Sequence, residues 1–154
     1  MASNAETKLA EMGITLPTPP TPAANYVPFT IAGNILTISG QIPTGPNGVE
    51  FVGKLGADTD VETGQAAARL CALNILAQAK AALGDLSRIK QVMKIQGYVN
   101  ATADFTAHPT VINGASDFLV EVLGVSGKHA RAAVGMSSLP LGVAVEVDAV
   151  IEIA

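Results

Sequence analysis

The stretch Val143-Ala-Val-Glu-Val-Asp-Ala-Val-Ile-Glu-Ile153, at the end of the chain, decides the fold. Successive side chains of a β-strand point to opposite faces of the sheet, so this stretch has two distinct rows. One row is entirely apolar: Val143, Val145, Val147, Ala149, Ile151 and Ile153. The other row is mixed and carries Glu146, Asp148 and Glu152. The pattern predicts a strand with its apolar row beneath helices and Glu146 on the opposite face.

The rest of the chain supplies the other layers of that sheet. Turn and capping signals predict a hairpin of residues 29–32 and 35–39 around Gly33-Asn34, strands at 89–99 and 130–138, and helices at 60–83 and 108–123. Residues 42–57 are rich in Gly and Pro and predict a long loop. The order β-β-α-β-α-β-β indicates an α/β fold, a two-layer sandwich of one mixed sheet and two helices.

Composition indicates that the free face of this sheet is covered by further copies of the chain. Of the 154 residues 49% are hydrophobic and only 14% are charged, against about 25% charged in ordinary soluble domains. A membrane span is not expected, because prolines and glycines interrupt the charge-free stretch 12–49. A homo-oligomer is therefore the preferred interpretation.

Charge and residue counts argue against several classes of function. The net charge is −4 and aromatic residues make up only 4%, so a nucleic-acid partner is not expected. The single Cys71 excludes an internal disulfide and a cysteine-based zinc site, and the two histidines, His108 and His129, are too few to build a metal site without carboxylate ligands. The first residues lack the features of a secretory signal, which favours a cytoplasmic protein.

The first 25 residues differ in character from the rest. Residues 1–12 fit a short helix, and the Pro- and Thr-rich residues 13–25 fit an extended surface segment outside the core. We therefore expect an N-terminal arm at 1–25 and one domain at 26–154.

Three short motifs carry polar residues that could do chemistry. Ser39-Gly40 ends one strand, Arg131 opens another, and Glu146 lies in the last strand. A tight turn at 139–142 between paired strands would place Arg131 and Glu146 on neighbouring strands. An arginine can hold a small carboxylate with two parallel hydrogen bonds. The same residues could instead form a strand-end turn and a structural ion pair.

Together the motifs resemble those of a known family, the Rid family of reactive-intermediate deaminases, also called YjgF or L-PSP endoribonuclease-like proteins. The resemblance is carried by Tyr26-Val27, Ser39-Gly40-Gln41-Ile42-Pro43, Ala130-Arg131, Leu139-Pro140 and Val145-Glu146-Val147, in this order. It covers about residues 25–154.

The resemblance implies a chorismate-mutase-like fold and a homotrimer with a central barrel and clefts between subunits. It implies hydrolysis of small 2-imino or enamine acids, such as 2-iminobutanoate or 2-iminopropanoate, to 2-keto acids and ammonia, without metal or cofactor. Arg131 would bind the substrate carboxylate and Glu146 would activate water. Substrate would also contact Tyr26, Ser39, Asn113 and the backbone at Ala132 and Ala133.

The chain also departs from the family pattern. Ala133 replaces a frequent cysteine, Gly135 replaces an acidic or polar residue, and His129 replaces the proline of Pro-Ala-Arg. The segment 105–113 is longer than the corresponding segment of the family pattern. A non-catalytic protein that binds small carboxylates or keto acids is the alternative to an enzyme. An endoribonuclease is less favoured, because the chain is acidic and offers no histidine pair suited to RNA cleavage.

Overall fold

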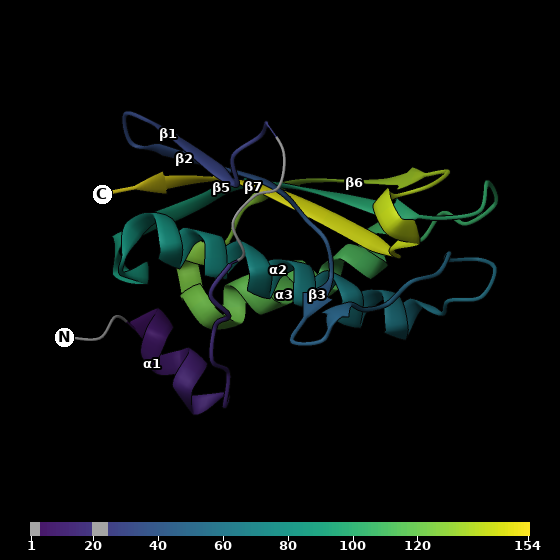
Figure 1. The fold of residues 1–154 in the computed structure, drawn as a ribbon, viewed down its shortest axis with the longest axis horizontal. Coiled ribbons are helices and arrows are strands. Elements are labelled where there is room, and N and C mark those ends of the chain that lie inside the picture. The colour runs from purple at the N-terminus through teal and green to yellow at the C-terminus, as the bar shows by residue number, and fades with distance from the viewer. Residues whose placement is uncertain (1–3, 20–24) are drawn as a thin grey trace.

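A computed structural model describes residues 4–19 and 25–154 of the chain. A five-stranded sheet lies over two long helices, as predicted, and a short third helix lies beneath them (Figure 1). The elements are α1 Asn4–Glu11, β1 Phe29–Ala32, β2 Ile35–Gln41, β3 Thr44–Gly45, β4 Gly48–Val49, α2 Val61–Leu83, β5 Ile89–Asn100, α3 His108–Leu123, β6 Ala130–Met136 and β7 Val145–Ile153. The segment predicted as a plain loop at 42–57 contains the small β3–β4 hairpin.

The sheet has the strand order β1-β2-β7-β5-β6. β7 is central and pairs antiparallel with β2 and β5, whereas β6 pairs parallel with β5. The prediction that the turn at 139–142 joins paired strands is therefore wrong. The chain leaves β6 at the sheet edge, and β7 then runs on the far side of β5 from β6. Leu141, at φ 57°, makes the sharp reversal in this connection.

The predicted two rows of β7 are confirmed by burial. Val145, Val147, Ala149, Ile151 and Ile153 are buried, and the residues between them are half-buried. The buried row packs against α2, because this helix carries many small residues on the face toward the sheet. The core therefore lies between the sheet and α2 and α3, and the opposite sheet face is left open within one chain.

Small residues allow α2 and α3 to pack closely together. A Cβ atom added to Gly114 would lie 2.1 Å from the backbone oxygen of Gln65, so only glycine fits there. α2 begins after Asp60, whose carboxylate accepts a hydrogen bond from Thr63 N at 2.8 Å. Its buried face includes Ala67, Ala68 and Cys71.

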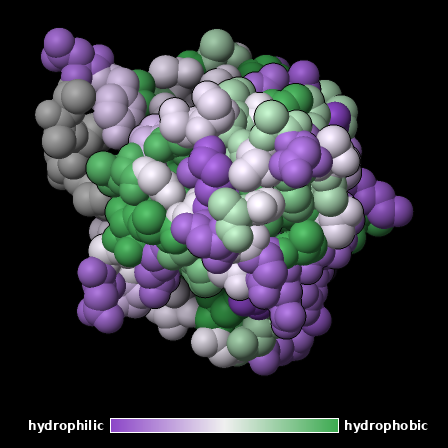
Figure 2. All heavy atoms as spheres, turned by 90° about the vertical axis from the view of Figure 1, so that its right-hand side faces the viewer, coloured by the Kyte–Doolittle hydropathy of each residue, from purple (hydrophilic) through white to green (hydrophobic). Residues whose placement is uncertain are grey.

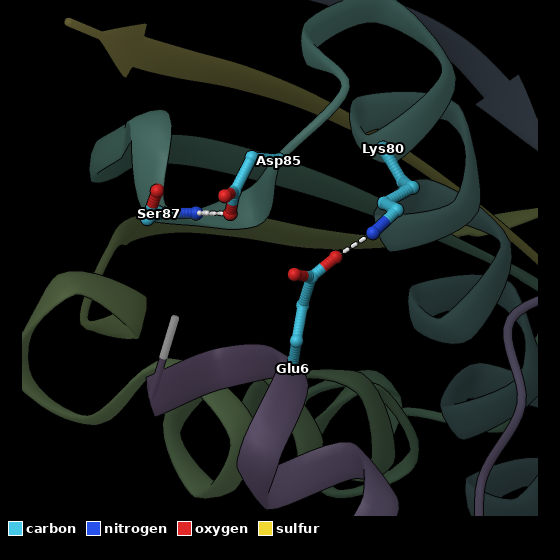
Figure 3. A network of polar contacts seen from close by, with 4 residues as sticks. All are labelled: Glu6, Lys80, Asp85 and Ser87. Carbon is cyan, nitrogen blue, oxygen red and sulfur yellow. Dashed lines mark hydrogen bonds and ion pairs between the residues drawn. The ribbon is translucent and has the colours of Figure 1, made fainter. Parts of the chain in front are cut away.

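The described part of the N-terminal segment packs on the helical layer. The helix predicted within 1–12 is present, and its Ala5 and Leu9 are buried in the core. Ile14 and Leu16 also pack against the core, although we expected residues 13–25 outside it. Figure 3 shows the ion pair that joins Glu6 of this helix to Lys80 of α2. These contacts make α1 a third layer on the side of the helices away from the sheet.

The exposed surface mixes polar and apolar side chains. Figure 2 shows one end of the molecule, where green apolar patches lie between purple polar ones. Val52 and Leu141 are exposed large apolar residues, at 63% and 71%. In the part of the chain that the structure describes, no helix has the length and apolar character to cross a membrane.

Candidate functional site

An irregularity in β2 shapes the first part of the candidate site. The β2–β7 register shifts between Ile38 and Gln41, so Ser39 and Gly40 form a bulge. The Ser39 hydroxyl donates a hydrogen bond to the backbone oxygen of Val27 at 2.7 Å. This bond ties the bulge to the segment that carries Tyr26, which is 60% exposed. Bulges of this kind redirect the chain next to functional sites.

Glu146 of β7 lies against this bulge on the open face of the sheet. A Cβ atom on Gly40 would lie 3.0 Å from Cδ of Glu146, so glycine leaves room for the carboxylate. Burial raises the pKa of Glu146 above its ordinary value, and the negative charge of Asp148 raises it further. A carboxylate with a raised pKa binds a proton more readily, which suits a general base. We call Tyr26, Ser39, Gly40 and Glu146 the Glu146 half-site.

A polar cluster continues the open face beside Glu146. The Tyr98 hydroxyl lies 2.5 Å from Gln96 Oε1 and 3.0 Å from Asp148 Oδ2. Burial is the largest cause of a raised pKa at Asp148, while the Tyr98 hydrogen bond and Lys94 act in the opposite direction. Burial also raises the pKa of Tyr98. Tyr98 therefore stays neutral at neutral pH, and its single hydroxyl hydrogen is shared between Gln96 Oε1 and Asp148 Oδ2 on the same face as Glu146.

Arg131 lies at the edge of the sheet, near the start of β6. It is in register with Ile95, a residue buried beneath the helices, so its side chain starts on the helical face. One guanidinium nitrogen, NH1, donates to Asn113 Oδ1 at 2.8 Å and to Ser116 Oγ at 3.1 Å. The side chain remains exposed. Arg131 is thus held by α3 and still open to solvent.

His129 extends this network. Its Nε2 lies 2.9 Å from Ser116 Oγ, and its Nδ1 lies 2.6 Å from the backbone oxygen of Gly127. Both His129 and Ser116 are half-buried. We call Arg131, Asn113, Ser116 and His129 the Arg131 half-site.

The next residues of β6 are small and leave space beside Arg131. Ala132 and Ala133 are half-buried, and Gly135 is exposed. His108, at the start of α3, covers Gly135: a Cβ atom there would lie 2.4 Å from His108 Nε2. His108 also meets Phe105 edge to face. His108 is half-buried against β6.

Within one chain the two half-sites do not meet. Glu146 is in register with Tyr98 on the open face, and Arg131 starts on the helical face, with β5 between their strands. The prediction that Arg131 and Glu146 lie on neighbouring strands is wrong, and so is an ion pair between them within one chain. Within one chain, therefore, Arg131 and Glu146 start on opposite faces of the sheet.

Two parts of the candidate site were not identified from the sequence. Ser116 follows Asn113 by three residues, a spacing that places both on one helix face, and this signal could have identified it. Tyr98 alternates with Gln96 along β5, but nothing in the sequence shows that Asp148 lies opposite them.

Other polar residues offer less. Cys71 is buried, and burial raises the pKa of its thiol well above the ordinary value, so it is an inert core residue. Over residues 4–19 and 25–154, no three His, Cys, Asp or Glu side chains gather as metal ligands do.

Comparison with known proteins places the chain in a family. Residues 6–153 match the model of the family described as "YjgF/chorismate_mutase-like, putative endoribonuclease". The chain belongs to this YjgF family. The resemblance to Rid proteins, which carry the same family name, is thereby confirmed, as is the α/β fold.

Individual relatives cover nearly the whole chain. Protein TCP17 of Trypanosoma cruzi is 49% identical over 94% of this chain and 91% of its own length. The crystal structure of Atu1372 from Agrobacterium tumefaciens, a protein of unknown function, is 53% identical, with a TM-score of 0.91 over 98% of this chain and 93% of its own. The structure of Escherichia coli TdcF with bound serine is 25% identical, with a TM-score of 0.65 over 89% of this chain and 94% of its own.

Proposed function

We propose that this YjgF-family protein is a hydrolase that converts small 2-imino acids, or their enamine tautomers, to 2-keto acids and ammonia. The observation that carries the proposal is the pair of complementary half-sites. One offers an exposed guanidinium, and the other offers a half-buried carboxylate with a raised pKa. A guanidinium binds the substrate carboxylate, and a carboxylate with a raised pKa accepts a proton from water.

The reaction site would lie between two copies of the chain. The open sheet face carries Glu146, Asp148 and Tyr98. Partial burial of such polar groups in a monomer costs free energy, which favours a face that binds a partner or a ligand. A homotrimer with its sheets turned inward would cover this face and create clefts at the subunit boundaries. Each cleft would join the Arg131 half-site of one copy to the Glu146 half-site of the next.

The chemistry requires few groups. Arg131 fixes the carboxylate of the 2-imino acid, and whichever of Ala132 and Ala133 directs its backbone N–H to the free edge of β6 orients the C2 atom. Glu146 takes a proton from a water molecule whose oxygen attacks C2, and the C=N π electrons move to the nitrogen, which takes that proton from Glu146. Glu146 then passes the proton of the new C2 hydroxyl to the same nitrogen, so the C–N bond breaks, ammonia leaves and the C2 carbonyl of the keto acid forms. Imine hydrolysis proceeds in water unaided, so positioning and one base supply the needed acceleration.

A second candidate is a protein that binds small carboxylates without turning them over. The relative TdcF was solved with bound serine, and serine has the carboxylate that Arg131 would hold. The two candidates differ in whether Glu146 acts on water, so one assay separates them.

The test generates 2-aminoacrylate or 2-iminobutanoate in place with a dehydratase and follows keto-acid release with and without the protein. Faster release than in water supports the hydrolase. Unchanged release with measurable binding of pyruvate or 2-oxobutanoate supports the binding protein. A parallel incubation with RNA tests the endoribonuclease activity in the family description, which the acidic composition of this chain does not favour.

A complementation experiment tests the intersubunit site directly. Arg131→Ala and Glu146→Gln proteins are each expected to be inactive. When the two are unfolded, mixed in equal amounts and refolded together, about one quarter of the sites regain both residues if the site joins two copies. A site contained in one chain would regain no activity in the mixture.

A further inference from the structure

In the hydrogen bonds around Arg131, the donor and the acceptor of each bond can be assigned. The backbone oxygen of Gly127 can only accept, so the Nδ1 of His129, 2.6 Å away, must carry the hydrogen. In the neutral ring Nε2 is then an acceptor, and the Ser116 hydroxyl donates to it across 2.9 Å. Ser116 Oγ keeps lone pairs for Arg131, whose NH1 lies 3.1 Å away.

These donor and acceptor assignments determine which edge of the Arg131 guanidinium is available to a ligand. NH1 has two hydrogens, and they are directed to Asn113 Oδ1 and Ser116 Oγ. The N–H groups of Nε and NH2 have no hydrogen-bond partner among residues 4–19 and 25–154, and the side chain is exposed. These two groups point along one edge with the spacing that matches the two oxygens of a carboxylate.

We infer that His129, acting through Ser116, is a positioning residue that turns the Nε–NH2 edge of Arg131 toward the carboxylate of the ligand. His129 needs no contact with the ligand for this role. The inference deepens the proposed function and rests on it for the identity of the ligand, a planar carboxylate bound edge-on. The orientation of Arg131 itself does not depend on the ligand.

The role uses a histidine that the Pro-Ala-Arg motif does not supply. His129 stands where the Pro-Ala-Arg motif has proline, and a proline side chain has no hydrogen-bonding group. The histidine therefore adds a hydrogen bond to Ser116 that the motif lacks, and we call the chain of hydrogen bonds from His129 through Ser116 to Arg131 the tether. Ser116 can join the tether because it lies one helical turn after Asn113, on the same face of α3.

The first experiment measures the orientation without ligand. Protein labelled with 15N in histidine and arginine is expected to show the Nδ1–H tautomer of His129 and a slowly rotating Arg131 guanidinium with resolved Nη signals. His129→Ala and Ser116→Ala should both restore fast rotation, and Ser126→Ala, a half-buried serine outside the network, should leave it slow. An Nε2–H tautomer, or rapid rotation in the unaltered protein, would overturn the inference.

The second experiment measures what the orientation does. His129→Ala and Ser116→Ala should each weaken binding of pyruvate or 2-oxobutanoate and raise KM by roughly tenfold. Ser116→Ala removes a hydrogen bond to the Arg131 guanidinium, and His129→Ala removes the bond that holds Ser116 in place. kcat should change by less than about twofold, because neither residue touches the reacting atoms. His129→Gln, whose side-chain oxygen can accept from Ser116, should recover much of the affinity.

The two experiments together separate the outcomes. Unchanged affinity in both alanine variants, or a fall in kcat at constant KM, would overturn the positioning role. If NMR shows the tether but the unaltered protein binds no small carboxylate, the proposed ligand fails while the orientation of Arg131 stands. A fall in affinity with His129→Ala that His129→Gln does not reverse would show that the acceptor at this position is not the cause.

Discussion

Gly40 and Glu146 are in contact across the β2–β7 pair, where a side chain on Gly40 would press on the carboxylate of Glu146. A Cβ atom at position 40 would lie 3.0 Å from Cδ and 3.1 Å from Oε2 of that residue. Glycine at position 40 thus leaves the space that the Glu146 carboxylate occupies. This contact offers a way to move Glu146 without changing its chemistry.

Gly40→Ala is expected to lower kcat by about tenfold or more, because the displaced carboxylate no longer reaches its water. The thermal midpoint should change little, since the atom that must move is the end of a flexible side chain. Steady-state kinetics and melting curves check both statements. In a Glu146→Gln background the same alanine should have no further effect, and an additive loss would show that Gly40 acts by another route.

Glu146→Gln is expected to reduce kcat by about 10²–10⁴-fold while leaving keto-acid affinity nearly unchanged. The amide keeps the shape of the side chain but cannot take a proton from water. Kinetics and calorimetric titration with 2-oxobutanoate make the test. Normal turnover in this variant would remove Glu146 from the mechanism.

The same substitution should not lower stability at neutral pH. The folded-state pKa of Glu146 is raised, so the folded protein binds the proton more tightly than the unfolded chain does. The stabilising contribution is therefore present below the unfolded pKa of about 4.3 and is lost as the pH rises through the folded pKa. Urea unfolding from pH 4 to 8 should show a shallower decline for Glu146→Gln than for the unaltered protein. A steeper decline would contradict the sign of this shift.

Arg131→Ala should abolish binding of small carboxylates and leave the fold intact. Removing one partner of a desolvated, hydrogen-bonded charge pair costs about 2–5 kcal/mol. The exposed Arg131 contributes little to the core. Arg69→Ala is the matched control, because this exposed arginine lies over the Phe118 ring outside both half-sites. Equal binding of pyruvate by the two variants would show that Arg131 has only a structural role.

Gly114→Ala should destabilise the fold, because the added atom would meet the backbone oxygen of Gln65 at 2.1 Å and force α2 and α3 apart. The expected loss is about 1–3 kcal/mol or more. Gly64→Ala is the comparison: its added atom would meet a Val111 methyl group at 3.1 Å, which can give way. Chemical denaturation of both variants measures the difference, and equal losses would contradict the close-packing account.

Much of the fold could be predicted from the sequence because its signals are local. The alternation in 143–153 determined which residues of β7 are buried, and Asp60, Gly84 and Gly124 marked where α2 and α3 begin or end. These signals come from side-chain periodicity and backbone conformation, which depend only on near neighbours. The resemblance to the family rests on the same local motifs in their order.

Which strands pair, and which residues meet, was decided by the tertiary structure. Arg131 and Glu146 are close in sequence, yet β5 separates their strands, because β6 takes the sheet edge in parallel with β5 and β7 takes the centre. The contacts of Arg131 with Ser116, and of Gly40 with Glu146, join segments far apart in the chain. No local signal reports such contacts: they arise when whole elements bury their apolar faces together, and the polar side chains follow the backbone.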